Sequence, residues 1–98
     1  MPYIKDEDRQ AFDHIIEQLC EELDESSFSA GDINYIISRI INKALSGRLS
    51  YAKINELIGV LECAKLELYR RVAARYEDTK IRDNGEVYDA PAILFMKG

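Results

Sequence analysis

The strongest constraint on the fold is the spacing of apolar residues, which recur every three or four positions in three separate stretches of the chain. This period places them on one face of an α-helix, whereas a half-buried strand requires strict alternation. The pattern therefore predicts three helices, each with an apolar stripe to bury. The apolar positions are Phe12, Ile15, Ile16, Leu19 and Leu23; Ile33, Ile36, Ile37, Ile40, Ile41 and Ala44; and Ile54, Leu57, Ile58, Leu61, Ala64, Leu68 and Val72.

The starts of these helices carry their own signals. Asp6–Asp8 crowd the first turn of the first helix, where carboxylates suit the positive end of the helix dipole. We expect Asp32 to cap the second helix. Ser50 is the expected cap of the third, with Leu49 before it and Ile54 placed to form a hydrophobic staple.

The stretch RDNGEV after the third helix is compatible with two structures. Asn84 and Gly85 have the composition of a two-residue hairpin turn. Alternatively, Gly85 ends the helix and Val87 folds back on it. The hairpin would place Asp83 opposite Glu86, a repulsive pair, so the sequence favours the helix ending.

The predicted fold class is all-α: a compact bundle of three main helices with a long third helix and a short non-helical C-terminal tail. A length of 98 residues fits one helical domain, with its core at 6–83 and its tail at 84–98. The second helix is expected to end near Ser46–Gly47, where glycine is free to take the left-handed conformation, and the third helix is expected to be the longest. The tail contains the apolar run Ala92–Met96, which we expect to be buried on the core or against another subunit.

Charge and composition exclude several classes of protein. Residues 1–28 carry two basic and nine acidic side chains, a net charge of −7, whereas residues 29–60 carry four and two, a net charge of +2. The whole chain has a net charge of −5 and no dominant basic stripe, so a nucleic-acid partner is not expected. The apolar runs fall well short of the roughly 20 residues that a membrane span requires.

The two cysteines indicate a reducing environment rather than a metal site. Cys20 and Cys63 lie 43 positions apart, and the chain has a single histidine. A structural zinc site normally needs four clustered Cys or His ligands. The start of the chain also lacks the pattern of a secretory signal. We therefore expect a cytoplasmic protein with two free thiols and no cofactor.

One lysine interrupts the apolar sector of the third helix, in the stretch GVLECAKLELYRR. At about 100° per residue Lys65 falls near the middle of the sector, with Glu62 and Tyr69 together at one edge. An unpaired buried ammonium costs several kcal/mol. The favoured interpretation is a snorkelling Lys65 tied to Glu62, and the second is a desolvated pair at a pocket or interface. A catalytic lysine is the least favoured, because the spacing assembles no nucleophile, base and orienting group around it. Glu67 and Arg70 fall on the far side and are expected to be ordinary solvated charges.

Two asparagines and one glycine inside helices suggest contacts with neighbouring elements. Asn34 and Asn55 occupy similar contexts, INYII and INELI, and each is expected to use its amide in a hydrogen bond between helices. Gly59 in the third helix costs about 1 kcal/mol relative to alanine. That cost suggests a close crossing by another helix.

Three segments together resemble a known family: MPYI at the start, INYII at 33–37, and LSYAKINELIGVLECAKLELYRRVAARYEDTKIRDNGEVY at 49–88. They are similar to a family of small uncharacterised proteins found in tailed phages and bacterial genomes. The resemblance implies that residues 51–88 form the core of the family, with the first helix and the tail as variable ends. It implies no activity.

The length of the third helix favours an interaction protein that is not an enzyme. A helix of about 26 residues or more is about 39 Å long, which exceeds what two shorter helices cover in a monomer of this size. Surplus apolar surface on such a helix is most simply buried by a second copy. We expect a homodimer formed through the third helix, or binding to another protein.

The alternative is an enzyme that resembles the all-helical nucleotide pyrophosphatases of the MazG type. These bind magnesium through EExxE followed later by ExxD, since magnesium takes clustered hard oxygen ligands. Here EELDE matches the first half, at Glu21, Glu22 and Glu25. The second half is absent after both Glu56 and Glu62. A half motif at an acidic helix end is weak evidence, so this function is disfavoured.

Overall fold

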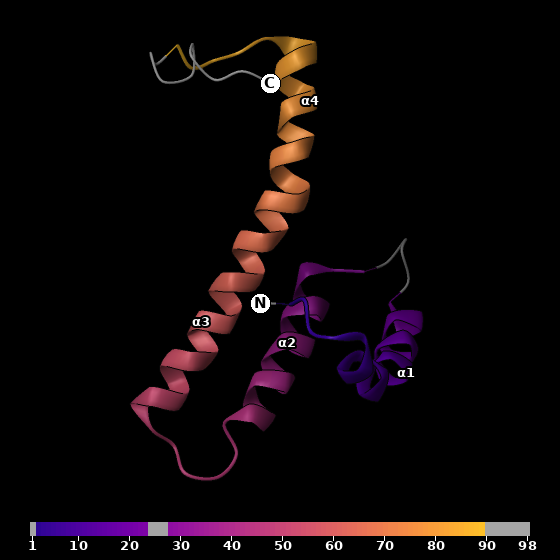
Figure 1. Ribbon diagram of the computed structural model, residues 1–98, viewed down its shortest axis with the longest axis vertical. Coiled ribbons are helices and arrows are strands. Elements are labelled where there is room, and N and C mark those ends of the chain that lie inside the picture. The colour runs from indigo at the N-terminus through magenta and orange to yellow at the C-terminus, as the bar shows by residue number, and fades with distance from the viewer. Residues whose placement is uncertain (1, 24–27, 90–98) are drawn as a thin grey trace. The chain divides into compact units, whose positions relative to one another are not determined.

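The computed structural model describes residues 2–23 and 28–89, and every regular element within them is helical. The all-α fold class is therefore confirmed, as is a long third helix, which continues without a break from Tyr51 to Asn84. The elements, in chain order, are α1 (Asp6–Glu22), α2 (Ala30–Ala44), α3 (Tyr51–Leu68), a π-helical turn (Tyr69–Ala73) and α4 (Ala74–Asn84) (Figure 1).

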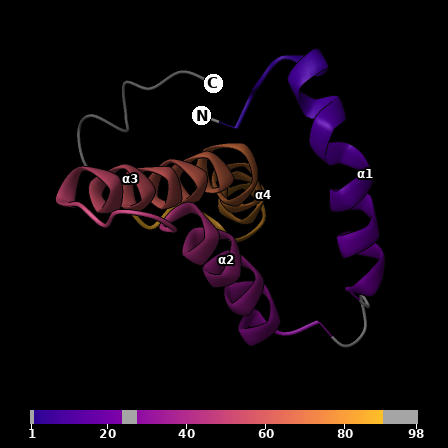
Figure 2. The same cartoon turned by 90° about the horizontal axis from the view of Figure 1, so that it is seen from below.

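The chain divides into two units, Met1–Glu62 and Cys63–Gly98. The first unit contains α1, α2 and most of α3, and a turn at 45–50 joins α2 to α3 (Figures 1 and 2). The second unit contains the last residues of α3, the π-helical turn and α4.

α1 begins where the sequence predicts, with three carboxylates in its first turn. Its N-cap, Lys5, makes no capping bond through its side chain. Instead, Arg9 donates from Nε to the carbonyl oxygen of Ile4 at 2.7 Å and lies 3.9 Å from the carboxylate of Asp6. The acidic first turn thus interacts with the helix dipole and with a cation one turn later.

The start of α2 differs from the prediction that Asp32 is the cap. Ser29 is the N-cap, and its Oγ accepts from the backbone N–H of Asp32 at 3.1 Å. The carboxylate of Asp32 accepts in return from the backbone N–H of Ser29 at 3.3 Å. This is a capping box in which Asp32 occupies the third helical position, so the helix begins three residues earlier than the apolar period indicated.

The turn between α2 and α3 agrees with the sequence prediction. Gly47 has a φ of 92°, the left-handed conformation that glycine adopts at low cost. Ser50 caps α3 by accepting from the backbone N–H of Lys53 at 3.1 Å. Lys53 also donates from Nζ to the carbonyl oxygen of Ser46 at 3.3 Å, which ties the turn to the helix. Leu49 and Ile54, the predicted hydrophobic staple, line the same surface pocket.

The π-helical turn was not predicted. The backbone N–H of Ala74 donates to the carbonyl oxygen of Tyr69, five residues back, so one extra residue is accommodated in this turn. Residues beyond it are therefore rotated relative to a uniform helical wheel. The apolar spacing from Leu68 to Val72 is an ordinary four residues and gives no sign of the change.

α4 ends at Gly85, so the helix ending is confirmed and the hairpin is not formed. Gly85 has a φ of 97°, and its N–H donates to the carbonyl oxygen of Ile81 at 2.8 Å. The prediction that Val87 folds back on the helix is wrong, because its side chain is 86% exposed. The N–H groups of Val87 and Tyr88 both donate to the carboxylate of Glu86 at 3.0 Å.

The burial expected of a compact bundle is not found. Across residues 2–23 and 28–89 no side chain is buried, and the apolar stripe of α1 is open, with Phe12 54% and Ile15 64% exposed. The close helix crossing expected at Gly59 is also absent, since no described atom from another helix lies within 4 Å of the position of an added Cβ. The predicted burial of Ala92–Met96 concerns residues outside the described ranges.

Candidate interaction surface

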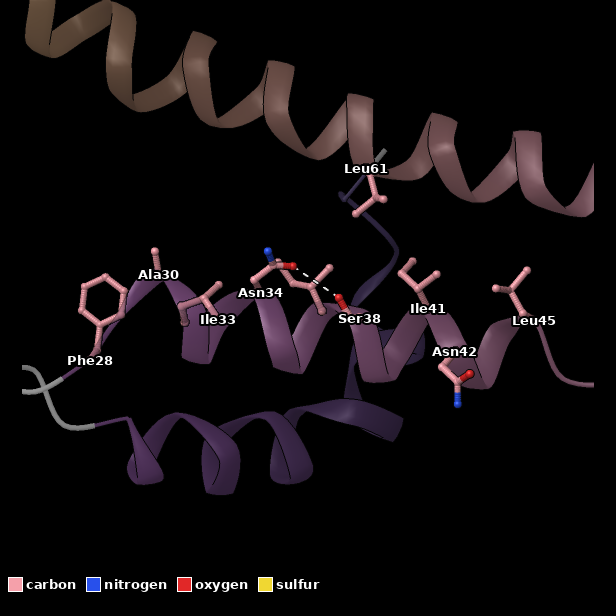
Figure 3. Close-up of a pocket in the computed structure, with 10 residues that line it drawn as sticks. Phe28, Ala30, Ile33, Asn34, Ser38, Ile41, Asn42, Leu45 and Leu61 are labelled. Atoms are coloured by element: carbon pink, nitrogen blue, oxygen red, sulfur yellow. Dashed lines mark hydrogen bonds between the residues drawn. The ribbon is translucent and has the colours of Figure 1, made fainter.

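An apolar surface lies along α2. Ile33, Ile36, Ile41 and Leu45 are partly covered, whereas Ile37 remains 40% exposed. An apolar groove runs along this helix, and Leu61 points toward it from α3 (Figure 3). The lining residues are Phe28, Ala30, Ile33, Asn34, Ile37, Ser38, Ile41, Asn42, Leu45 and Leu61.

The groove has the chemistry of a surface that binds apolar groups. Its volume of about 740 Å³ lies within the range of small-molecule sites. Catalytic sites of that size, however, contain titratable groups that act as acid, base or nucleophile. Among the lining residues that the structure describes, none carries a charge, and the polar ones are Asn34, Ser38 and Asn42. The groove therefore suits an apolar side chain or helix face better than a reaction.

These three polar residues form a row along α2, four positions apart. The hydroxyl of Ser38 donates to Oδ1 of Asn34 at 3.3 Å (Figure 3). The sequence suggested a hydrogen bond from Asn34 to another helix. Asn34 instead bonds within its own helix. Asn55, the second predicted asparagine, is exposed on α3.

The opposite side of α2 is charged and aromatic. The guanidinium of Arg39 lies 5.9 Å from the centroid of the Tyr35 ring, a cation–π arrangement. Asp32 stands in the first turn of this helix and Lys43 in its last turn. Each sign is therefore at the helix end where the dipole favours it.

The cluster predicted on the third helix lies at the surface. Glu62 and Lys65 belong to α3, and Tyr69 is the first residue of the π-helical turn. All three are exposed, Tyr69 by 61%, so the single chain does not enclose Lys65 in a core. Their participation in an interface stays a prediction.

A neighbouring ion pair was missed. Arg70 donates from Nε to Oε2 of Glu67 at 3.4 Å and from Nη2 to Oε1 of Glu67, forming a bidentate ion pair. The Glu67 side chain is only 14% exposed, against 66% for Arg70. The prediction of two ordinary solvated charges is therefore wrong for Glu67. The sequence did carry a signal for this ion pair, because an acidic and a basic residue three positions apart on a helix can interact.

The acidic end of α1 provides no assembled metal site in the described part of the chain. Glu21 and Glu22 are exposed at the end of the helix, and Glu25 lies outside the described residues. Within residues 2–23 and 28–89, no three His, Cys, Asp or Glu side chains are grouped to hold a metal ion. Cys20 and Cys63 are free and exposed.

No helix in the described ranges has the length and apolar character that crossing a membrane requires.

These features define a small all-helical protein with an apolar groove along α2 whose described lining residues carry no charge. The chain belongs to the family described as a domain of unknown function (DUF6899), which matches residues 1–87. The match includes α1 as well as residues 51–87 of the segment that the sequence resemblance placed at the family core. Comparisons with curated proteins and with solved structures gave no match.

Proposed function

We propose that this chain is a non-enzymatic interaction protein that forms a homodimer and buries the apolar sector of its third helix in the interface. The observation that carries the proposal is the exposure of large apolar side chains along α3. Ile58 is 59%, Leu61 42% and Leu68 62% exposed. Removing such side chains from water stabilises an association by about 1.5–3 kcal/mol for each one fully buried.

A second copy is the simplest cover for this surface. Within the first unit, α2 and the first part of α3 both leave apolar side chains open, including Ile37 at 40% and Ile58 at 59%. Contiguous exposed apolar surface on a soluble protein usually marks an interaction site. Closed two-fold dimers are by far the commonest soluble assemblies, because one surface then covers itself.

The proposed setting is a reducing cytoplasm, in a phage or bacterial context as the sequence resemblance suggests. Two exposed free thiols support it. An oxidising compartment favours disulfide formation, which would link chains with accessible thiols to one another.

The dimer is tested by a matched pair of substitutions on α3. Ile58 and Val60 are both β-branched and exposed to 59% and 57%. At about 100° per residue they lie about 160° apart, and only Ile58 falls in the apolar sector. Ile58→Asp should give a monomer in analytical ultracentrifugation, whereas Val60→Asp should keep the wild-type mass. Circular dichroism confirms that both variants remain helical.

Two results would contradict the proposal. One is a wild-type monomer at high micromolar concentration, and the other is equal behaviour of the two variants. The non-enzymatic part has a separate test, in which nucleoside triphosphates are incubated with the protein and magnesium. Magnesium-dependent hydrolysis that is lost in Glu22→Gln would establish the pyrophosphatase instead.

A further inference from the structure

α1 combines an open apolar stripe with a large negative charge. Seven of its 17 residues are acidic and one, Arg9, is basic. The carboxylates at 6–8 suit the helix dipole, but Glu21 and Glu22 do not, because they lie at the negative end of the dipole and no basic residue shares their turn. Neither forms an ion pair with another residue in the described ranges. The dipole therefore explains only the first half of this charge.

Two carboxylates border the apolar stripe of α1, one on each side. At about 100° per residue, Asp13 lies about 60° from Ile16, and Glu22 lies about 20° from Ile15. Ile15 and Ile16 are 64% and 51% exposed. A surface that covers the stripe must therefore meet carboxylates at both edges. Removing carboxylates from water is unfavourable unless cations face them, so the surface that fits is apolar with a basic border.

The turn between α2 and α3 has the opposite charge. Residues 33–55 contain four basic side chains and no acidic one: Arg39, Lys43, Arg48 and Lys53. Lys53 donates to the carbonyl oxygen of Ser46, and Arg39 stacks on Tyr35, but neither interaction neutralises the positive charge. None of the four cations forms an ion pair with a carboxylate in the described part of the chain.

Apolar side chains lie among these cations. Ile40 is 60%, Leu49 62% and Tyr51 86% exposed. Leu49, Tyr51 and Ile54 line a surface pocket at the start of α3. Arg48 and Lys53 directly precede Leu49 and Ile54 in the chain. Residues 39–54, the basic turn, thus have the apolar surface and the positive border that the stripe of α1 requires.

We propose that α1 of one copy docks on the basic turn of a second copy, and that the reciprocal contact forms at the same time. The apolar stripe of α1 then covers Leu49, Tyr51 and Ile54 of the other copy. The carboxylates of Asp13 and Glu22 face its cations. A two-fold axis generates two identical contacts and closes the assembly as a dimer.

Charge complementarity favours a second copy over a foreign partner. One chain supplies both surfaces, the negative one and the positive one, and leaves both exposed. A foreign basic partner on α1 would leave the basic turn open, and a foreign acidic partner on the turn would leave α1 open. A symmetric pair covers all four surfaces at once.

The connection within one chain also favours a second copy. Residues 23–29 join the end of α1 that carries Glu21 and Glu22 to Ala30, at the start of α2. The basic turn follows the other end of α2, about 21 Å along the helix axis from Ala30. A second copy can bring the same carboxylates to the turn without this restriction.

The inference rests on the proposed homodimer and names one of its contacts. Ile54 belongs to the apolar sector of the third helix, which the homodimer is proposed to bury. The docking of α1 adds Phe12, Ile15 and Ile16 to the buried apolar surface. Both surfaces lie in the first unit, Met1–Glu62.

The contact is tested by exchanging charges between two variants. Asp13→Lys/Glu22→Lys makes the edges of the stripe basic, and Lys43→Glu/Arg48→Glu makes the turn acidic. Each variant alone places like charges together in both contacts, so its dissociation constant should rise about tenfold or more in sedimentation velocity. An equimolar mixture should recover the wild-type affinity, because both contacts of the mixed dimer again join opposite charges.

Net charge provides an internal control. Asp13→Lys/Glu22→Lys raises the net charge from −5 to −1, so general repulsion alone would predict tighter association, the opposite of the expected result. Glu77→Lys/Asp78→Lys on α4 changes the net charge equally and should leave the dissociation constant within about twofold. Circular dichroism checks the fold of each variant. A chain with all four substitutions at 13, 22, 43 and 48 should dimerise again, which excludes misfolding as the cause of the loss.

The possible outcomes separate the two proposals. A wild-type monomer overturns both. A wild-type dimer whose affinity survives the two charge-reversed variants overturns the contact between α1 and the basic turn and leaves the homodimer standing. Variants that lose affinity alone and do not recover it in the mixture also overturn the contact between copies.

Discussion

α2 and α4 are helices of 15 and 11 residues that the same chain forms for different physical reasons. α2 starts at a reciprocal capping box and carries isoleucines through every turn. α4 has the sequence ARYEDTKIRDN and continues from the π-helical turn without a side-chain cap. Its polar groups interact locally: Thr79 donates to the carbonyl oxygen of Tyr76 at 2.6 Å, and Lys80 lies 5.3 Å from the Tyr76 ring.

This difference shows which helix needs a partner. Most of the stability of a protein helix comes from packing an apolar face, since isolated helices shorter than about 12–15 residues are marginal in water. α4 has one aliphatic side chain after Ala74, Ile81, and is otherwise suited to solvent. α2 has an apolar face that its own unit leaves partly open. An interaction is therefore expected to depend on α2 far more than on α4.

The largest expected effect comes from placing a charge on each helix in turn. Ile40→Asp should weaken the homodimer more than about a hundredfold, because each copy loses the burial of one isoleucine, worth about 2 kcal/mol, and both copies are changed. Ile81→Asp should leave the dissociation constant within about twofold. Sedimentation velocity across a concentration series measures both. A larger effect at Ile81 would move the interaction to the second unit.

The second comparison uses the glycines that follow the two helices. Gly47 and Gly85 have φ values of 92° and 97°, which side chains other than glycine adopt at a cost of about 1–2 kcal/mol. The turn at Gly47 is tied at both ends, by α2 and by the Lys53–Ser46 bond, so its strain cannot relax. Gly47→Ala should therefore lower the free energy of unfolding by about that amount. Gly85→Ala should instead loosen the last turn of α4.

Thermal unfolding and amide hydrogen exchange distinguish these two outcomes. Gly47→Ala should lower the melting temperature, whereas Gly85→Ala should mainly increase exchange at the last amides of α4 and at residue 85, whose N–H donates to Ile81. Equal melting temperatures for the two variants would show that the turn between α2 and α3 is no more constrained than the end of α4.

The same contrast explains what the sequence predicted and what it did not. Ser50 and Gly85 were identified because a cap and a left-handed glycine act within a few residues. Ser29 was missed because the capping box closes through Asp32, itself a plausible cap, and the apolar period begins only at Ile33. The π-helical turn had no signal at all, since one extra residue in a turn leaves the spacing from Leu68 to Val72 unchanged.

Burial was harder to predict than helical structure. An apolar stripe shows which face of a helix avoids water, but it does not identify the surface that covers it. Lys65 illustrates the problem, since the wheel placed it inside a core that the described residues of the single chain do not form. The α2 groove was also missed as a site, because isoleucines at helical spacing indicate a buried face whether the cover is another helix of the chain or a second copy.

The smallest of the three effects concerns the local bonds that each helix uses. Ser29→Ala removes the acceptor for the N–H of Asp32 and leaves that amide without its cap, so unfolding should become easier by about 1 kcal/mol. Thr79→Ala removes a hydroxyl that donates to a carbonyl already within a helix, and alanine is the better helix former. Its effect should lie within about 0.5 kcal/mol of zero.

Urea unfolding followed by circular dichroism measures the effects of Ser29→Ala and Thr79→Ala. Each comparison with the wild type is made at one protein concentration, since dimerisation would otherwise shift the midpoint. If α2 owes its order mainly to a second copy, the Ser29→Ala cost should grow as protein concentration rises, because the capped helix then forms only in the dimer. A cost that is independent of concentration would show that the capping box maintains the helix in the monomer as well.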